Sequence, residues 1–502
     1  MENKELQAVI KTEIKNIDNQ ISMKEKMYTI GFTLILAIIY ERFFTGKQWG
    51  VSIPIFYILF MGVFLWSTRE KITVKKSIGF IIIIPTLLVA LNYSIHSNSI
   101  LNFFNGIMIV VLTCVSTVLI RYENIKWDSA NLMNIVFKRG IKSIPQNIHK
   151  PFIFIKSNIA SKNKKEMSST KKSIIRGIII SIPLLIVVLL LLTSADMVFK
   201  HYITNLSGGF KFISIGKIIN QLFVIIIVFV IIFSYIWSFK YTCDESGNKK
   251  ININWEPVTI LTIIFMINMV YLLFSIVQFS YLYGGVNNVL PESFTYSEYA
   301  RKGFFELVAV TIINFTILLC SMNFIKKGNK TISTICNVFL TTLVAFTLNM
   351  LFSAHFKMSL YEQTYGFTYL RIFVHLFMIM LFMLLIVLLI GIWNRRMPLN
   401  KVLVVIIISM YILLNYINVD KIIAGKNIDI YYKTQKIDAL YLRNLSYDAI
   451  PEILRLKDDS NMIVAMQVAN YLEDLRNELA QEDSWYEFNY SKYRARKAIE
   501  EN

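Results

Sequence analysis

Long runs of apolar residues decide what this chain can fold into. Its 502 residues contain eleven predominantly apolar runs, and six of them, including 258–283, have no Asp, Glu, Lys or Arg. A transmembrane helix needs about 20 such residues to cross the hydrocarbon core of a bilayer. Backbone polar groups in hydrocarbon must pair with one another, and solid apolar runs lack the alternation of barrel strands. The runs are therefore predicted to be membrane-spanning helices.

We predict an all-α, polytopic membrane protein with about eleven spans. Their predicted limits are 27–44, 51–66, 77–93, 101–120, 174–197, 214–238, 258–283, 304–325, 331–352, 371–393 and 402–419. Only 17% of the residues are charged, against about a quarter in soluble domains. A soluble enzyme, a disordered chain and a disulfide-rich secreted scaffold are excluded. The first run is interpreted as a retained span because it has no small-residue cleavage site.

The distribution of Lys and Arg predicts the orientation of the spans. With the N-terminus in the cytosol, every cytosolic segment has at least three basic residues and no outer loop has more than two. An excess of basic residues marks the cytoplasmic side. An odd number of spans then places the C-terminus outside. We expect a multi-pass protein of the bacterial cytoplasmic membrane.

The chain divides into five predicted regions. They are a cytosolic amphipathic segment at 1–26, spans 1–4 at 27–120, a basic cytosolic loop at 121–173, spans 5–11 at 174–419 and an extracytoplasmic domain at 420–502. Apolar residues in the last region recur at helical spacing, which predicts about four helices there.

The net charge of +19 is spread over short loops between apolar runs, so no nucleic-acid partner is expected. The loop at 121–173 mixes basic and aromatic residues, a composition that suits contact with anionic lipid headgroups. Lys138, Arg139 and Lys142 are the predicted headgroup contacts. A merely solvated loop is the alternative. An envelope protein is a second expected type of partner.

Polar residues gather in three clusters at the predicted outer ends of the spans. Before span 8, Thr295 and Glu298 form a capping-box pattern that starts a helix. The residues of interest there are Glu298, Tyr299, Arg301, Lys302 and Glu306. A carboxylate such as Glu306 past the membrane boundary is costly without a partner, and Lys302 lies one helical turn earlier.

The other two clusters lie at the ends of spans 5, 9 and 10. Between spans 9 and 10, a short interfacial helix is predicted to end at Gly366, and Thr368 is predicted to cap the next helix. The residues of interest are Tyr361, Glu362, Arg371 and His375, in a segment that also contains His355 and Lys357. At the end of span 5 stands Asp196. Topology places all three clusters on one side, which predicts a shared polar site; an interfacial helix start held by ion pairs is the alternative.

No motif for known chemistry accompanies these clusters. The chain has no phosphate-binding glycine loop, no dinucleotide fingerprint, no metal-ligand spacing and no nucleophile elbow. We predict no catalytic residue, no metal site and no cofactor. The span centres offer mainly Asn220, Gln221, Asn268, Asn314 and Asn349, which argues against a proton-coupled pump.

Several longer motifs resemble a known family. They are Thr193-Ser-Ala-Asp-x-Val-Phe199, the Tyr296-x-Glu-Tyr-Ala-Arg301 core of 290–307, Met358-x-Leu-Tyr-Glu-x-x-Tyr-Gly-Phe-Thr-x-Leu-Arg371, Asp438-x-x-Tyr-Leu442, Leu445-Ser-x-Asp-Ala-Ile-Pro451 and Asn489-x-Ser-x-Tyr-Arg-Ala495. From about residue 170 to the end, the chain resembles the bacterial membrane-protein family catalogued as domain of unknown function 4173, and its relative 4153. The resemblance implies a polytopic protein with an extracytoplasmic helical tail and no assigned activity. Met197 stands where relatives often have proline.

Three functions are open at this point. The favoured hypothesis is non-enzymatic binding or translocation of a lipid or small solute at the outward-facing polar site. The second is an envelope sensor or scaffold that acts through the C-terminal domain and a partner protein. The third is a membrane-embedded transferase for a lipid-linked substrate, with Glu306, Asp196 or His375 as the general base.

Overall fold

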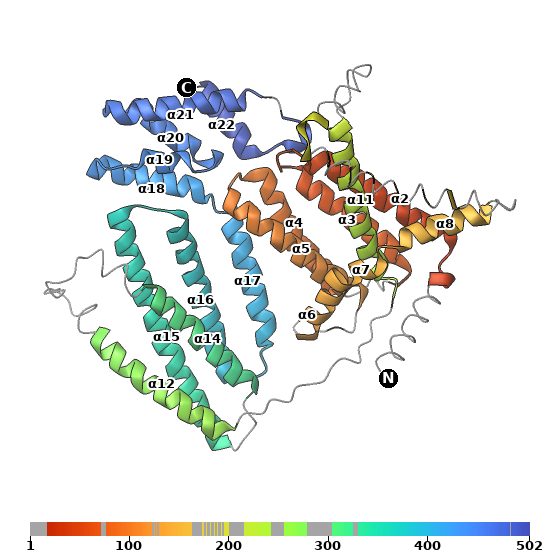
Figure 1. The fold of residues 1–502 in the computed structure, drawn as a ribbon. Coiled ribbons are helices and arrows are strands. Elements are labelled where there is room, and N and C mark those ends of the chain that lie inside the picture. The colour runs from red at the N-terminus through yellow and green to blue at the C-terminus, as the bar shows by residue number, and fades with distance from the viewer. Residues whose placement is uncertain are drawn as a thin grey trace. The chain divides into compact units, whose positions relative to one another are not determined.

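The computed structural model describes residues 18–71, 77–122, 125, 127, 130–162, 215–241, 256–278, 304–324, 330–481 and 483–501, with single residues between 173 and 199. In these ranges every regular element is a helix and no strand occurs (Figure 1). The predicted all-helical class is confirmed. The N-terminal amphipathic segment lies largely outside the described residues, and so does most of the predicted span at 174–197.

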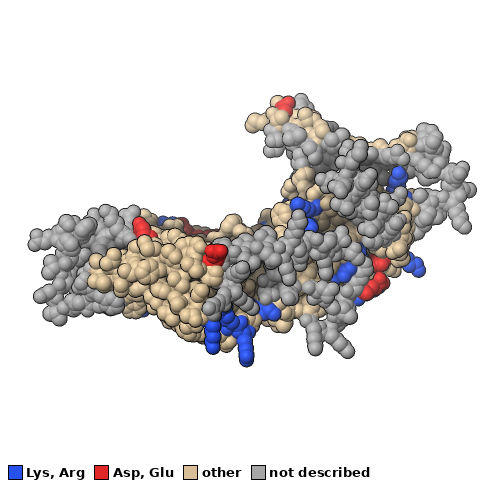
Figure 2. All heavy atoms as spheres, turned by 90° about the horizontal axis from the view of Figure 1, so that it is seen from below, with Lys and Arg blue, Asp and Glu red and all other residues tan. Residues whose placement is uncertain are grey.

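Within the described residues, nine helices are long and apolar enough to cross a membrane. They are α2 (Met23–Phe44), α4 (Ile78–Ile95), α5 (Ser99–Arg121), α11 (Ile215–Ser238), α12 (Pro257–Gln278), α14 (Phe304–Phe324), α15 (Lys330–Tyr365), α16 (Tyr369–Trp393) and α17 (Leu399–Tyr416). A shorter apolar helix, α3, covers Ser52–Thr68. On the face drawn in Figure 2, the described surface is mostly uncharged, and charged side chains form a few separate groups. Such a surface suits contact with lipid.

The remaining helices are short or amphipathic. In the predicted basic loop they are α6 (Ala130–Phe137), the π-helical segment η2 (Lys138–Lys142), α7 (Ser143–Asn147) and α8 (Lys150–Lys162). The C-terminal region contains α18 (Val419–Thr434), α19 (Ala439–Arg443), α20 (Ile450–Ile453), α21 (Met462–Leu479) and α22 (Tyr490–Glu501). Single 3₁₀ turns are η1 (Arg69–Lys71), η5 (Tyr447–Ala449), η6 (Leu454–Leu456) and η7 (Trp485–Glu487).

The first of two compact units comprises Met1–Ile95, Phe103–Gly247 and Asp483–Asn489. Its helices pack through fully buried aromatic and aliphatic side chains, including Phe64, Ile120 and Phe239. A neighbouring cluster is centred on Phe233 and Trp237, whose rings stack 5.5 Å apart. The interior of this unit is therefore rich in aromatic rings.

A C-terminal segment of the chain completes this first unit. The carboxylate of Glu487 accepts hydrogen bonds from Lys47 Nζ at 3.0 Å and from the Gln48 backbone N–H at 3.1 Å. Gly50 lies against the same segment, and a Cβ there would be only 2.4 Å from the Phe488 carbonyl oxygen. Only glycine fits at this close approach of two backbones. The turn between α2 and α3 and the chain at 483–489 are thus held together.

The second unit comprises His96–Asn102, Asn248–Glu482 and Tyr490–Asn502. Helices α12, α14, α15, α16 and α17 pack around a core that includes Leu343, Ala354 and Leu385, all fully buried. A second core, with Ile423 and Ile450, joins helices α18–α22 and also takes in Ile372 of α16. The C-terminal helices therefore pack on the beginning of α16.

Helix α15 corrects one prediction. The sequence predicted a span at 331–352 and a separate interfacial helix, but α15 is one helix of 36 residues, about 54 Å long. That length exceeds the thickness of the hydrocarbon core of a bilayer. The helix continues because Ala354 and Met358 extend its buried face beyond the predicted end of the span. The helix does end at Gly366, which has a φ of +77°. Thr368 is the N-cap residue of α16, as predicted, but its side chain makes no capping hydrogen bond.

Replacing Gly366 with alanine should destabilise the chain. Its left-handed backbone disfavours a side chain, and a Cβ would lie 2.6 Å from Asn427 Oδ1, which holds the Phe367 N–H at 2.7 Å. We expect a loss of about 1–3 kcal/mol, seen as a lower thermal midpoint in detergent. Gly62→Ala is the matched control, since nothing lies within 4 Å of a Cβ there. Equal midpoints for the two variants would contradict the argument.

Candidate functional site

Two histidines and a glutamate form a hydrogen-bonded chain between α15 and α16. His375 Nε2 lies 2.9 Å from Glu362 Oε2, and His375 Nδ1 lies 3.0 Å from Nδ1 of His355. Glu362 is buried, His375 is half-buried and His355 is exposed. The chain therefore links a buried carboxylate to the surface through two imidazole rings.

One oxygen of the buried Glu362 carboxylate lacks a hydrogen-bond partner among the described residues. Glu362 has a side-chain exposure of 7%, and its Oε1 has no hydrogen-bond partner among the described residues. Burying a polar atom without a partner costs about 1–3 kcal/mol, so such atoms are rare. A carboxylate oxygen accepts hydrogen bonds, and the group that satisfies it must be a donor.

Arg371 fixes the turn beside this site. Its guanidinium donates to the carbonyl of Tyr365 at 3.0 Å and to that of Gly366, and it stacks on the Tyr361 ring at 4.4 Å. These carbonyls belong to the C-terminus of α15, where a cation is favourable. Arg371 thus caps the helix and positions Tyr361, and its charge is already engaged.

Glu306 and Lys357 add a second pair of opposite charges in the same unit. Glu306 is exposed in the first turn of α14, and the nearly buried Lys357 of α15 interacts electrostatically with it. The sequence suggested Lys302 as the partner of Glu306, and Lys302 lies outside the described residues. In the structure, Lys357 of a different helix lies close enough to Glu306 to interact with its charge.

A column of polar side chains continues along α12, α14 and α15. Its members are Asn268, Tyr271, Ser275 and Gln278 on α12, Asn314 on α14, and Thr347, Asn349 and Ser353 on α15. Gln278 donates to Ser353 Oγ at 2.7 Å. Asn314 donates to Thr347 Oγ1 at 3.0 Å and accepts from the Tyr271 hydroxyl at 2.7 Å. Three asparagines noted at the span centres, Asn268, Asn314 and Asn349, belong to this column.

The structure assigns different surroundings to the other predicted residues. Asp196 is exposed and accepts from the N–H groups of Val198 at 2.7 Å and Phe199 at 3.3 Å, so it caps a helical turn. Glu298, Tyr299, Arg301 and Lys302 lie outside the described residues. Of the three predicted clusters, the one at Tyr361, Glu362, Arg371 and His375 is therefore the one whose geometry is defined here: Glu362 contacts His375, and Arg371 contacts Tyr361. That these residues bind a ligand stays a prediction.

The predicted headgroup contacts divide into two kinds. Arg139 donates to the Ser238 carbonyl at 2.7 Å and stacks on the Tyr122 ring at 5.4 Å, so it holds α11 to the preceding helices. Lys138 and Lys142 are exposed on η2. The two lysines remain available to a lipid phosphate, and their contact with headgroups stays a prediction.

Two other carboxylates in the second unit, those of Asp420 and Asp448, have hydrogen-bond partners at both oxygens. Asp420 is 2% exposed and accepts from Asn98 Nδ2 at 2.6 Å, from the Ser446 N–H at 2.9 Å and from the Tyr369 hydroxyl. Asp448 accepts from the Ser97 N–H at 3.0 Å and Asn418 Nδ2 at 3.0 Å, and its Oδ1 lies 2.9 Å from His96 Nδ1. These contacts join the turn at 96–98 to the C-terminal helices.

The sequence places His355 in the segment between spans 9 and 10 but not among the predicted ligand contacts, and it predicts no role for these two aspartates. His355 precedes Glu362 by seven residues, or two helical turns, so both lie on the same face of a helix. This spacing could have indicated that His355 belongs with Glu362. Asp448 and His96 are 352 residues apart, and no local pattern connects them. Among the described residues, no group of three His, Cys, Asp or Glu side chains is arranged to hold a metal ion.

The fold and its apolar helices define a multi-pass, α-helical membrane protein. The profile of a family described as domain of unknown function (DUF4153) matches residues 83–456, and the chain belongs to this family. The resemblance had placed family 4173 first and 4153 as its relative; the match is to 4153, not to 4173 itself. The match begins earlier than residue 170 and ends within the C-terminal region. No curated protein and no solved structure matches the chain.

The junction at Asp448 should respond to acid. Burial raises the pKa of Asp448, but the hydrogen bonds from His96 and the Ser97 backbone outweigh burial and hold it below its usual value. The stability from this carboxylate is therefore complete above about pH 4 and is lost as the pH falls through the lowered pKa.

Asp448→Asn should lower the thermal midpoint at pH 7, because it removes hydrogen bonds to a charge worth about 1.5–3 kcal/mol. The difference from the natural chain should shrink as the pH falls below about 4. Asp474→Asn, at a carboxylate with 73% side-chain exposure, should change little at any pH. A difference for Asp448→Asn that is the same at pH 7 and pH 3 would show that the carboxylate charge is unimportant.

Proposed function

We propose that this protein binds a lipid headgroup or small solute, without a chemical reaction, at an outward-facing site between the ends of α15 and α16. The observation that supports it is the buried Glu362 carboxylate, with Oε2 next to His375 and Oε1 without a partner among the described residues. In contrast, the buried Asp420 carboxylate has donors at both oxygens. Asp420 is fully hydrogen-bonded within the fold, as a structural carboxylate is, whereas Glu362 keeps one oxygen that a ligand can use.

The chemistry of the site narrows the ligand class. The free group is an acceptor on a carboxylate, which suits an ammonium or hydroxyl donor. Arg371, the cation that would select phosphate or carboxylate, is engaged by backbone carbonyls. We therefore propose an amine-bearing ligand, such as the headgroup of an amino lipid or a small amine.

The polar column offers a basis for translocation. Its amides and hydroxyls provide exchangeable hydrogen-bond partners along the interior of α12, α14 and α15. A solute that leaves Glu362 for this column would keep polar partners inside the bilayer, where lipid offers none. Binding is the primary proposal, and movement along the column extends it.

The outward orientation can be tested by labelling a cysteine in the C-terminal region. Ser460 is exposed in the turn before α21, so Ser460→Cys should react with a membrane-impermeant maleimide on intact cells. Cys243, in the predicted cytosolic loop at 239–257, should react only after lysis. Protection of Cys at 460 until lysis would invert the topology and move the site to the cytosolic side.

Glu362→Gln should weaken the binding of ethanolamine by about 10- to 100-fold, since a hydrogen bond to a charged group contributes about 1.5–3 kcal/mol. Calorimetry on the purified full chain in detergent would measure it. Choline has the same charge and no N–H donor, and it should bind much more weakly than ethanolamine.

Glu473→Gln is the matched control, because Glu473 is exposed on α21 and outside the site. It should leave ethanolamine binding unchanged. Equal affinities in the natural chain and in Glu362→Gln, or no binding of any amine, would reject the proposal.

A further inference from the structure

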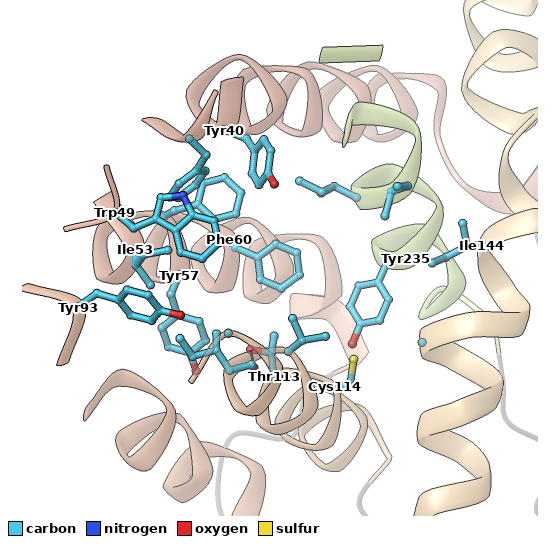
Figure 3. A pocket seen from close by; sticks show the side chains of 18 residues that line it. Tyr40, Trp49, Ile53, Tyr57, Phe60, Tyr93, Thr113, Cys114, Ile144 and Tyr235 are labelled. Atoms are coloured by element: carbon cyan, nitrogen blue, oxygen red, sulfur yellow. Dashed lines mark hydrogen bonds between the residues drawn. The ribbon is translucent and has the colours of Figure 1, made fainter. Parts of the chain in front are cut away.

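A second site lies in the other unit, in a cavity that the polar site does not involve. The cavity has a volume of about 400 Å³ and is lined by residues of α2, α3, α4, α5, η2, α7 and α11 and of the turn after α2 (Figure 3). Ligand pockets commonly have volumes of about 300–1,000 Å³. The cavity is therefore large enough to hold a molecule.

The wall of the cavity is mostly apolar. Its lining is dominated by aromatic and aliphatic side chains such as Phe44, Ile53 and Phe60. The Thr113 hydroxyl donates to the Ile109 carbonyl at 2.6 Å, and the Tyr235 hydroxyl lies 2.5 Å from Thr117 Oγ1. Water needs two to four polar partners to stay in a cavity, and apolar cavities take up hydrocarbon instead.

Two glycines keep the cavity open. Gly106 on α5 and Gly140 on η2 both line it. A Cβ at Gly106 would lie 3.3 Å from the Tyr93 hydroxyl, and one at Gly140 would lie 3.5 Å from Cys114 Sγ. Along α5, the lining from Gly106 to Cys114 covers a rise of about 12 Å, so the space is elongated. Larger side chains at either glycine would fill it.

The cavity opens on an exposed apolar surface. Val110 and Ile231 belong to its lining, and their side chains are 63% and 44% exposed. On the same helix, the neighbouring residues Phe103 and Ile107 are also exposed, so this face of α5 is a continuous apolar surface. In a bilayer, the molecules in contact with such a surface are lipid acyl chains.

The two ends of the cavity differ. Tyr40, Trp49 and Tyr93 lie at one end, near the turn between α2 and α3, and Cys114, Ile144 and Tyr235 lie at the other (Figure 3). Tyr and Trp are enriched at the level of lipid headgroups, where their polar atoms meet water and their rings meet hydrocarbon. The aromatic end is thus the natural entrance for a chain whose headgroup stays at the interface.

We infer that this cavity binds one acyl chain of a bilayer lipid, which enters at the Tyr40, Trp49 and Tyr93 end and extends toward Cys114. The occupant is hydrocarbon because the wall is mostly apolar, and it is a chain because the space is elongated. It comes from the bilayer because the opening lies on an exposed apolar surface. This site is independent of the amine-binding site proposed above.

Photo-crosslinking of the full chain tests this inference. The protein is reconstituted in phosphatidylethanolamine and phosphatidylglycerol vesicles with a trace of phosphatidylcholine whose acyl chain carries a diazirine. Labelled residues are assigned by mass spectrometry. We expect labels on lining residues such as Ile53 and Ile109, in addition to labels on the lipid-facing Phe103 and Ile107, which serve as the internal standard.

Gly140→Leu and Gly106→Leu fill the cavity from its two ends and should each reduce labelling of Ile53 and Ile109 by roughly five-fold or more. Labelling of Phe103 and Ile107 should persist. Gly62→Leu on α3 is the matched control, because nothing lies within 4 Å of a Cβ there. Thermal midpoints and gel filtration identify any variant that fails to fold, and two independent fillings keep the test decisive.

Two results would overturn the inference. Labelling confined to Phe103 and Ile107 in the natural chain would mean that no acyl chain enters the cavity. Labelling of Ile53 and Ile109 that is unchanged in both filled variants would mean that those residues meet lipid elsewhere.

Discussion

Backbone hydrogen bonding in hydrocarbon governs this structure. Lipid supplies no donors or acceptors, so each segment that crosses the bilayer must satisfy its own N–H and C=O groups as a helix. The same constraint acts on side chains. Thr113 and Thr311 return their hydroxyls to carbonyls one turn earlier, and Asn314 pairs with Thr347 across two helices. Several buried side-chain atoms have no hydrogen-bond partner among the described residues, and the Glu362 oxygen is the one carboxylate atom in that group, which makes it informative.

The packing of α15 determines where the Glu362 carboxylate lies. Ala354 and Met358 keep α15 packed against its neighbours well past the thickness of hydrocarbon, and Glu362 lies one turn further on. The carboxylate is therefore buried by protein and not by lipid. His375 and His355 connect it to the surface by hydrogen bonds, so the side chains between Glu362 and the surface are polar.

Much of the fold could be predicted from the sequence, because solid apolar runs allow few alternatives. The grouping of Tyr361, Glu362, Arg371 and His375 could also be predicted, since one tight turn at Gly366 separates the two helices that carry them. The continuity of α15 could not, because polar residues near its end resemble an interfacial segment. The cavity near Gly106 could not be predicted, for a different reason. Its wall comes from helices that are distant in sequence, and no local sequence pattern indicates that they pack together.

The attachment of Glu487 to Lys47 has a consequence for biosynthesis. These residues are 440 positions apart, and the segment at 483–489 belongs to the unit built mainly from the first half of the chain. Contacts between such distant residues form late. The first unit therefore emerges from the ribosome with one piece of its surface missing, and it stays incomplete until residues 483–489 have been made. A stop codon just before residue 483 would leave all the predicted membrane spans present but the first unit unfinished.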